Sequence, residues 1–304
     1  MNTDPVTPET LAASVIAVPP LARNPDLSLN RAEGEKQIRH LEAGGVTTLL
    51  YGGNAIIQHI GLGEYADLMD MLAECAGDDT LIIPSVGPNF GTLIDQAEIL
   101  RDMPFPTAMI LPTRDMATPA GVATAVRHFV EMANRPAVLY IKHDGFIDVA
   151  RAKQLMDDGL LAWIKYAVVR DDTSNDDYLR ELVDAVGPSR IVSGIGEQPA
   201  ITHIREFGLT SFTSGCVCVA PQLSMQMLRA VQAADFARAE EIRQLFSPLE
   251  DLRNAINPVR VLHTAVTLSG IASMGPLMPL LCDVSDEDAV AIGAAAKQLL
   301  ALNV

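Results

Sequence analysis

Residues 119–142, PAGVATAVRHFVEMANRPAVLYIK, contain the pattern that decides the fold. The first part, up to Pro136, has apolar residues at helical spacing and closes on a proline, a residue that ends helices. The second part, PAVLYIK (136–142), is a short and nearly continuous apolar run, which is typical of a strand buried on both faces. A helix that leads directly into such a strand indicates parallel βαβ units.

The same pattern recurs along the first two-thirds of the chain. Eight apolar runs have strand length, at residues 14–20, 47–53, 81–87, 107–113, 136–142, 161–167, 190–196 and 211–215. Segments of helical period, such as NRAEGEKQIRHLEAGG (30–45), lie between them. Eight alternating units favour a (β/α)8 TIM barrel, an α/β fold, with an open doubly wound sheet as the alternative.

After residue 221 the pattern is helical to the end of the chain. We therefore predict a catalytic barrel domain over residues 1–221 and a C-terminal helical extension over 222–304, packed on the barrel as a bundle. Ser285 is expected to be the N-cap of the last helix, because three acidic residues follow it in the first turn. This extension is interpreted as a packing or oligomer surface.

Composition limits the classes of partner. The formal net charge is -16, which repels nucleic acid and anionic lipid, so neither is expected as a partner. The four cysteines include no CxxC pair and no nearby histidine, so free thiols and no metal are expected. No apolar run approaches the ~20 residues of a membrane span, and the N-terminus does not resemble a signal peptide. These features predict a cytoplasmic protein that does not enter a membrane.

Lys165 is the strongest single candidate for chemistry. It is one of only five lysines, and it interrupts the apolar strand LAWIKYA (161–167). Burial lowers the pKa of a lysine, and a neutral amine is the nucleophile that forms a Schiff base. The alternatives are a lysine that reaches out of the strand end to water, or one that pairs with a carboxylate such as Glu197.

Other candidates follow from the rule that barrel enzymes place working residues at the C-terminal ends of strands. Tyr140, one βα unit before Lys165, could relay protons, or its hydroxyl could simply reach water. Lys142 is the rival nucleophile or a second cation, and as the last residue of its strand it could equally be exposed. His143 is the one histidine near this presumed site, and Arg114 follows the fourth strand.

Two glycine-containing turns also fall at strand ends. Gly53 and Asn54 follow the second strand, where unpaired backbone N–H groups and the asparagine amide could bind a carboxylate, although this is also ordinary turn chemistry. Gly194 follows the seventh strand in a segment that lacks the third glycine of a dinucleotide fingerprint, so no organic cofactor is predicted. Thr213 lies on the eighth strand.

Taken in order, these residues resemble the dihydrodipicolinate synthase and N-acetylneuraminate lyase superfamily of Schiff-base aldolases and dehydratases. The similar segments are Val18-Pro19-Pro20-Leu21, Gly52-Gly53-Asn54-Ala55 with Glu64 downstream, Tyr140, Ile164-Lys165, Phe212-Thr213-Ser214-Gly215 and Asn257-Pro258-Val259-Arg260. The resemblance implies a barrel with a C-terminal helical bundle, usually a homotetramer (a homodimer is the alternative), and an imine on Lys165 with pyruvate or a pyruvate-containing sugar acid.

The departures from the family pattern argue against dihydrodipicolinate synthase activity itself. Gly53 and Asn54 replace the two threonines of the carboxylate loop, and Thr113-Arg114 replaces a tyrosine pair of the proton relay. Gly145 stands where those enzymes place an arginine that binds their aldehyde substrate. Lys142, His143 and Arg114 look like an alternative lining for a hydroxylated, anionic substrate.

The sequence therefore predicts a lyase that acts on pyruvate or a 2-keto-3-deoxy sugar acid through a Lys165 Schiff base, by aldol cleavage or condensation, without metal or cofactor. A dehydratase of a deoxy-keto sugar acid that uses the same imine is the first alternative. A degenerate barrel that binds a sugar acid without turnover is the second.

Overall fold

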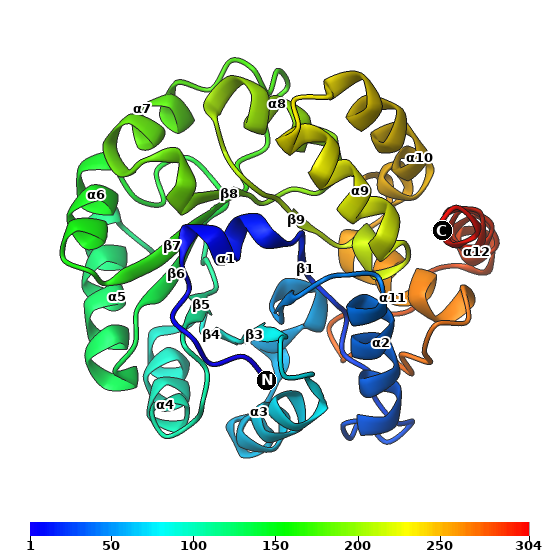
Figure 1. Ribbon diagram of the computed structural model, residues 1–304. Coiled ribbons are helices and arrows are strands. Elements are labelled where there is room, and N and C mark those ends of the chain that lie inside the picture. Colours follow the sequence, from blue (N-terminus) through cyan, green and yellow to red (C-terminus); the bar gives the residue numbers. More distant parts are fainter. Residues whose placement is uncertain (304) are drawn as a thin grey trace.

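The computed structural model describes residues 1–303 and forms a ring of helices around a core of strands (Figure 1). The strands are β1 (Ile16–Ala17), β2 (Thr48–Leu50), β3 (Leu81–Ile83), β4 (Ser85–Val86), β5 (Ala108–Ile110), β6 (Ala137–Ile141), β7 (Leu161–Tyr166), β8 (Ile191–Ser193) and β9 (Thr213–Ser214). The α-helices are α1 (Pro8–Ala13), α2 (Arg31–Ala43), α3 (Leu62–Cys75), α4 (Phe90–Arg101), α5 (Pro119–Ala133), α6 (Val149–Asp157), α7 (Asp177–Val186), α8 (Glu197–Phe207), α9 (Pro221–Gln232), α10 (Phe236–Ala255), α11 (Pro258–Leu268) and α12 (Asp286–Ala301).

Local sequence sets the ends of the element pair α5 and β6. The Thr118 hydroxyl accepts a hydrogen bond from the backbone N–H of Gly121, and Pro119 begins the helix, where its missing N–H is not needed. The helix ends at Asn134, which adopts a left-handed conformation with φ 53°. The chain then enters β6, whose apolar residues are fully buried.

The strands form two parallel sheets that join into one ring. Their orders are β3-β2-β1-β9 and β4-β5-β6-β7-β8. β3 and β4 are successive parts of one strand interrupted at Pro84, which cannot donate to the ladder. At the other edge, Ser193 of β8 forms a parallel bridge with Phe212, directly before β9. Eight strands thus close into the predicted (β/α)8 barrel, and the open sheet is excluded.

The helices complete the ring and then leave it. α9 follows β9 and stands between α8 and α2 in Figure 1, in the place of the eighth barrel helix. We therefore propose that the barrel unit runs through Gln232, beyond the predicted boundary at residue 221, and the division into two domains stays a prediction. α10 packs on α8 and α9, α11 contacts α10, α12 and the short 3-10 helix Gly53–Ala55 after β2, and α12 lies at the outer edge (Figure 1).

The last helix begins as its sequence predicts. The Ser285 hydroxyl accepts a hydrogen bond from the backbone N–H of Asp288 at 3.1 Å, which confirms Ser285 as the N-cap of α12. Within residues 1–303, none of the helices has the length and apolar character that crossing a membrane requires.

Candidate active site

Two adjoining hollows open at the C-terminal ends of the strands. The inner lobe, about 370 Å³, contains Lys165 and Asn54, and the outer lobe, also about 370 Å³, contains Arg114. Gly53, Tyr140 and Lys142 line both. The lobes therefore form one site, at the end of the barrel where the sequence places its candidates.

Lys165 lies on β7 inside the barrel, with only 4% of its surface exposed. Its strand pairs with β6 so that Lys165 is the register partner of Tyr140, and its Nζ lies 4.6 Å from the centre of the Tyr140 ring. Burial lowers the pKa of Lys165 to about 7, and the charges of Lys142 and Arg253 lower it further. A substantial fraction of the amine is thus neutral, and nucleophilic, near pH 7.

The structure excludes both structural alternatives for Lys165. At 4% exposure the amine does not reach out to bulk water. It forms no ion pair with any carboxylate of the described chain, and the Glu197 carboxylate instead accepts a hydrogen bond from the Ser224 hydroxyl at 2.9 Å. Lys142, the rival nucleophile, is exposed at the mouth, where partial burial and the nearby Arg114 charge lower its pKa.

The ring of Tyr140 faces the Lys165 amine, and the same side chain lines both lobes. Burial raises the pKa of Tyr140 to about 12, so the phenol keeps its proton at neutral pH. A protonated phenol beside an amine can donate a proton to a leaving oxygen atom.

A glycine is required next to the lysine. A Cβ atom on Gly194, directly after β8, would lie 2.7 Å from the Tyr166 carbonyl oxygen and 3.0 Å from Cγ of Lys165. Only a residue without a side chain allows this close approach of β8 to the Lys165 stem. Gly194 therefore lines the site as expected, and its place is fixed by packing.

The loop after β2 contributes backbone donors. Gly53 and Asn54 open a short 3-10 helix, Gly53–Ala55, and the first N–H groups of a helix have no acceptor within it. The Asn54 side-chain amide donates instead to the Val18 carbonyl at 2.8 Å, so it joins the loops after β1 and β2. Because the Asn54 amide is already used, only the backbone N–H groups of this loop are available to bind an anion.

The remaining sequence candidates surround these residues. Thr213, on β9, is buried and lines the inner lobe. Arg114 and His143 line the outer lobe, with Arg114 exposed. The two ring nitrogens of His143 lie 3.0 and 3.2 Å from backbone carbonyl oxygens, which ties together the loops after β5 and β6.

Residues from the C-terminal helices also line the inner lobe, and the sequence reasoning missed three of them as site residues. Arg253, Asn254 and Asn257 come from the end of α10 and the start of α11. Asn257 caps α11 by accepting hydrogen bonds from two backbone N–H groups, and its segment was part of the family resemblance. No sequence signal marked Arg253. The extension is therefore more than a packing surface, because it closes one side of the site.

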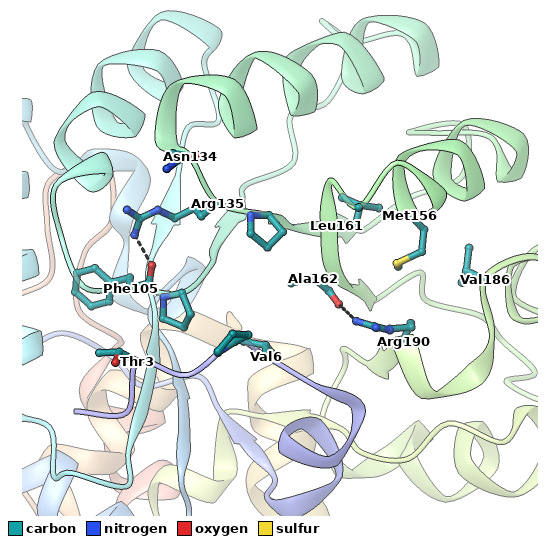
Figure 2. A pocket seen from close by; sticks show the side chains of 14 residues that line it. Thr3, Val6, Phe105, Asn134, Arg135, Met156, Leu161, Ala162, Val186 and Arg190 are labelled. Carbon is teal, nitrogen blue, oxygen red and sulfur yellow. Dashed lines mark hydrogen bonds between the residues drawn. The ribbon is translucent and has the colours of Figure 1, made fainter.

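Another hollow, of about 590 Å³, lies at the opposite end of the barrel (Figure 2). Its position is shown by Leu161 and Ala162, the first residues of β7. Figure 2 shows Arg135 directed at the Phe105 carbonyl and Arg190 at the Ala162 carbonyl, the latter at 3.1 Å. Both arginines donate hydrogen bonds to backbone carbonyl groups, so we interpret this end of the barrel as contributing to stability rather than to ligand binding. Nowhere in residues 1–303 do three potential metal ligands of the His, Cys, Asp and Glu types gather.

Comparison with known proteins agrees with this geometry. The family model described as the dihydrodipicolinate synthetase family matches residues 13–299. The chain belongs to this family. Members of the dihydrodipicolinate synthetase superfamily are lyases or dehydratases, which supports an enzyme of that class.

Individual relatives of the family are distant in sequence. A probable 5-dehydro-4-deoxyglucarate dehydratase of Rhizobium meliloti (strain 1021) is 24% identical over 243 residues, covering 75% of this chain and 78% of the relative. A dihydrodipicolinate synthase structure from Agrobacterium tumefaciens has a TM-score of 0.84 at 15% identity, covering 96% of this chain and 100% of that one. A sialic acid aldolase catalytic lysine mutant from Ruminococcus gnavus has a TM-score of 0.82 at 12% identity, covering 95% and 96%. At these identities the solved structures establish the shared fold.

Proposed function

We propose that this protein is a lyase that forms an imine between Lys165 and the ketone of a 2-oxo-3-deoxy sugar acid. The observation that carries the proposal is the environment of Lys165: a buried amine with no ionic partner in the described chain, facing a hollow beside a tyrosine. Structural burial of an unpaired lysine is unfavourable, which makes a chemical role the better explanation.

The groups around Lys165 suit imine formation. The neutral amine attacks C2, and the resulting carbinolamine loses its hydroxyl as water when Tyr140 donates a proton to that oxygen. The products are one imine and one water molecule. The carboxylate next to the ketone is assigned to the backbone N–H groups of Gly53 and Asn54, beside the Thr213 hydroxyl.

Of the reactions open to this imine, we propose dehydration. Tyr140, left as a phenolate when the carbinolamine loses its hydroxyl, accepts the C3 proton that the imine makes acidic. The resulting enamine expels the C4 hydroxyl as water when Tyr140 returns that proton to the oxygen. Burial raises the pKa of Tyr140, so the phenol starts protonated and its phenolate is a strong base, which suits a group that takes and returns one proton. The Rhizobium relative is named as a dehydratase of 5-dehydro-4-deoxyglucarate, which is a 2-oxo-3-deoxy acid when it is numbered from its keto end.

Borohydride trapping tests the proposal. The protein is incubated with pyruvate and borohydride and then digested for peptide mass spectrometry. We expect a reduced adduct on Lys165, its loss in Lys165→Arg, and its retention in Lys142→Arg. An adduct confined to Lys142, or none at all, would overturn the assignment.

A panel of 2-oxo-3-deoxy acids then separates the reactions. Release of pyruvate would show aldol cleavage, whereas loss of water without pyruvate would show dehydration. Trapping without turnover of any member would favour the non-catalytic binding barrel. The homotetramer implied by the resemblance and the cytoplasmic location predicted from composition stay predictions.

A further inference from the structure

The charge of the site is opposite to that of the chain. Three cations line the two lobes beside the Lys165 amine, namely Lys142, Arg114 and Arg253, and none of the lining residues is acidic. The protein as a whole has a formal net charge of -16. A site with this excess of positive charge is suited to a substrate with more than one negative group.

Arg253 reaches the inner lobe from the end of α10. Its guanidinium lies against Gly215, where a Cβ atom would be only 2.8 Å from Nη2, so the glycine makes room for it. Its hydrogen bonds are long: Nη1 lies 3.8 Å from Sγ of Cys216, and Nε lies 3.5 Å from the Pro258 carbonyl oxygen. Among residues 1–303 no carboxylate oxygen comes within 4.0 Å, so the guanidinium keeps donors for a ligand.

The two buried acids whose charges act on Arg253, Glu250 and Glu197, each use one carboxylate oxygen elsewhere. Glu250, one helical turn earlier on α10, accepts a hydrogen bond from the backbone N–H of Glu197 at 3.0 Å and thereby anchors α10 to the start of α8. The Glu197 carboxylate accepts from Ser224. Burial raises the pKa of both carboxyl groups, and the charge of Glu197 raises that of Glu250 further. This acid pair therefore holds the helix that carries Arg253 without forming an ion pair with it.

The other free cations are less suited to fixed recognition of a carboxylate. Lys142 and Arg114 are exposed at the mouth, and Lys165 is the proposed nucleophile. A guanidinium held on a helix offers two parallel N–H donors that match the geometry of a carboxylate.

We propose that Arg253 binds a second carboxylate, at the end of the substrate chain remote from the ketone, so that the enzyme prefers a 2-oxo-3-deoxy diacid to the monoacid of equal length. This inference rests on the proposed function, in which the first carboxylate occupies the loop of Gly53 and Asn54. It makes Arg253 a residue for specificity rather than for imine formation.

The test compares Arg253→Gln with the unaltered enzyme on a matched pair, a 2-oxo-3-deoxyaldarate and the 2-oxo-3-deoxyaldonate with the same hydroxyl configuration. We expect KM for the diacid to rise roughly 10- to 100-fold, the equivalent of losing a charge-assisted hydrogen-bonded pair, with KM for the monoacid within about twofold. Arg238→Gln is the matched control, because Arg238 is an exposed residue of the same helix that pairs with Glu241. It should change neither value.

Pyruvate trapping on the same variants distinguishes the two proposals. Pyruvate has no second carboxylate, so Arg253→Gln should be trapped at Lys165 as readily as the unaltered protein at about pH 9, where Lys165 is neutral even without the nearby charge of Arg253. Suppose that the unaltered protein is trapped at Lys165. If KM of Arg253→Gln then rises equally for the diacid and the monoacid, or if this variant is no longer trapped with pyruvate, Arg253 does not bind a second carboxylate and the imine proposal stands. If the unaltered protein is not trapped, the imine proposal itself fails.

A second variant, Arg253→Lys, keeps the proposal testable if Arg253→Gln folds poorly. Arg253→Lys keeps the charge but replaces the two parallel donors with a single ammonium group. We expect it to raise KM for the diacid by a smaller factor and to leave the monoacid unchanged. An unaltered enzyme that preferred the monoacid would also refute the inference.

Discussion

Lys165→Met should make the protein more stable at neutral pH, because the buried amine is unfavourable to the fold. The pKa of Lys165 is lowered from 10.5 to about 7, so between these values the unfolded chain binds more protons than the folded protein. The unfavourable contribution is full below about pH 7 and disappears as the pH rises through 10.5. Integrating the linkage relation gives about 4 kcal/mol at pH 7 and roughly 1–2 kcal/mol at pH 9.5.

Urea unfolding measures the difference directly. The free energy of unfolding of the variant should exceed that of the unaltered protein by an amount that falls by about 2–3 kcal/mol between pH 7 and pH 9.5. The fall is the informative quantity, because any packing gained or lost with the methionine is the same at both pH values. Lys153→Met serves as the control, since Lys153 is a half-exposed residue that pairs with Asp157 on α6.

The result that would refute this reasoning is a stability difference independent of pH. It would mean that the amine keeps an ordinary pKa in the folded state, and hence that burial does not prepare it as a nucleophile. If the buried amine is kept for function at the expense of stability, Lys165→Met should instead be more stable and inactive.

Three further predictions concern the same site. The rate of borohydride trapping should rise with pH to a plateau, with an inflection near pH 7. Lys142→Met should move that inflection to higher pH, because it removes a positive charge that lowers the pKa of Lys165. Stopped reactions quantified by mass spectrometry measure both inflections, and an unmoved inflection would show that the Lys142 charge does not act on Lys165. Tyr140→Phe should lower kcat for the best acid of the panel by about 100-fold or more while leaving KM nearly unchanged, as loss of an acid catalyst predicts, and steady-state kinetics with equal values for both proteins would assign the proton transfer elsewhere. Gly194→Ala should reduce trapping at Lys165, because its methyl group would meet the Tyr166 carbonyl and the lysine stem; full trapping with unchanged circular dichroism would show that the strand end can move aside.

The sequence by itself determined the fold class and singled out Lys165 as the residue proposed for the chemistry. Alternation of apolar runs and helical segments is a local property, because each strand buried on both faces must be apolar along its whole length and each helix shows its own period. The run around Lys165 is legible in the same way, since a lysine within an apolar strand has no packing explanation. Tyr140 follows from the register of consecutive strands, and parallel pairing of β6 with β7 makes the two residues partners.

Only the tertiary structure decided how the site is closed. Arg253 lies nearly ninety residues after Lys165 on a helix whose sequence is that of an ordinary amphipathic segment. Its place depends on the Glu250 anchor to α8 and on the gap at Gly215, and neither contact leaves a periodic signal in the chain. The Asn54 amide shows the same limit: sequence suggested a donor for the substrate, whereas the loop that packs beside it places the Val18 carbonyl within its reach. Contacts between distant segments depend on the path of the chain, which residue spacing alone does not specify.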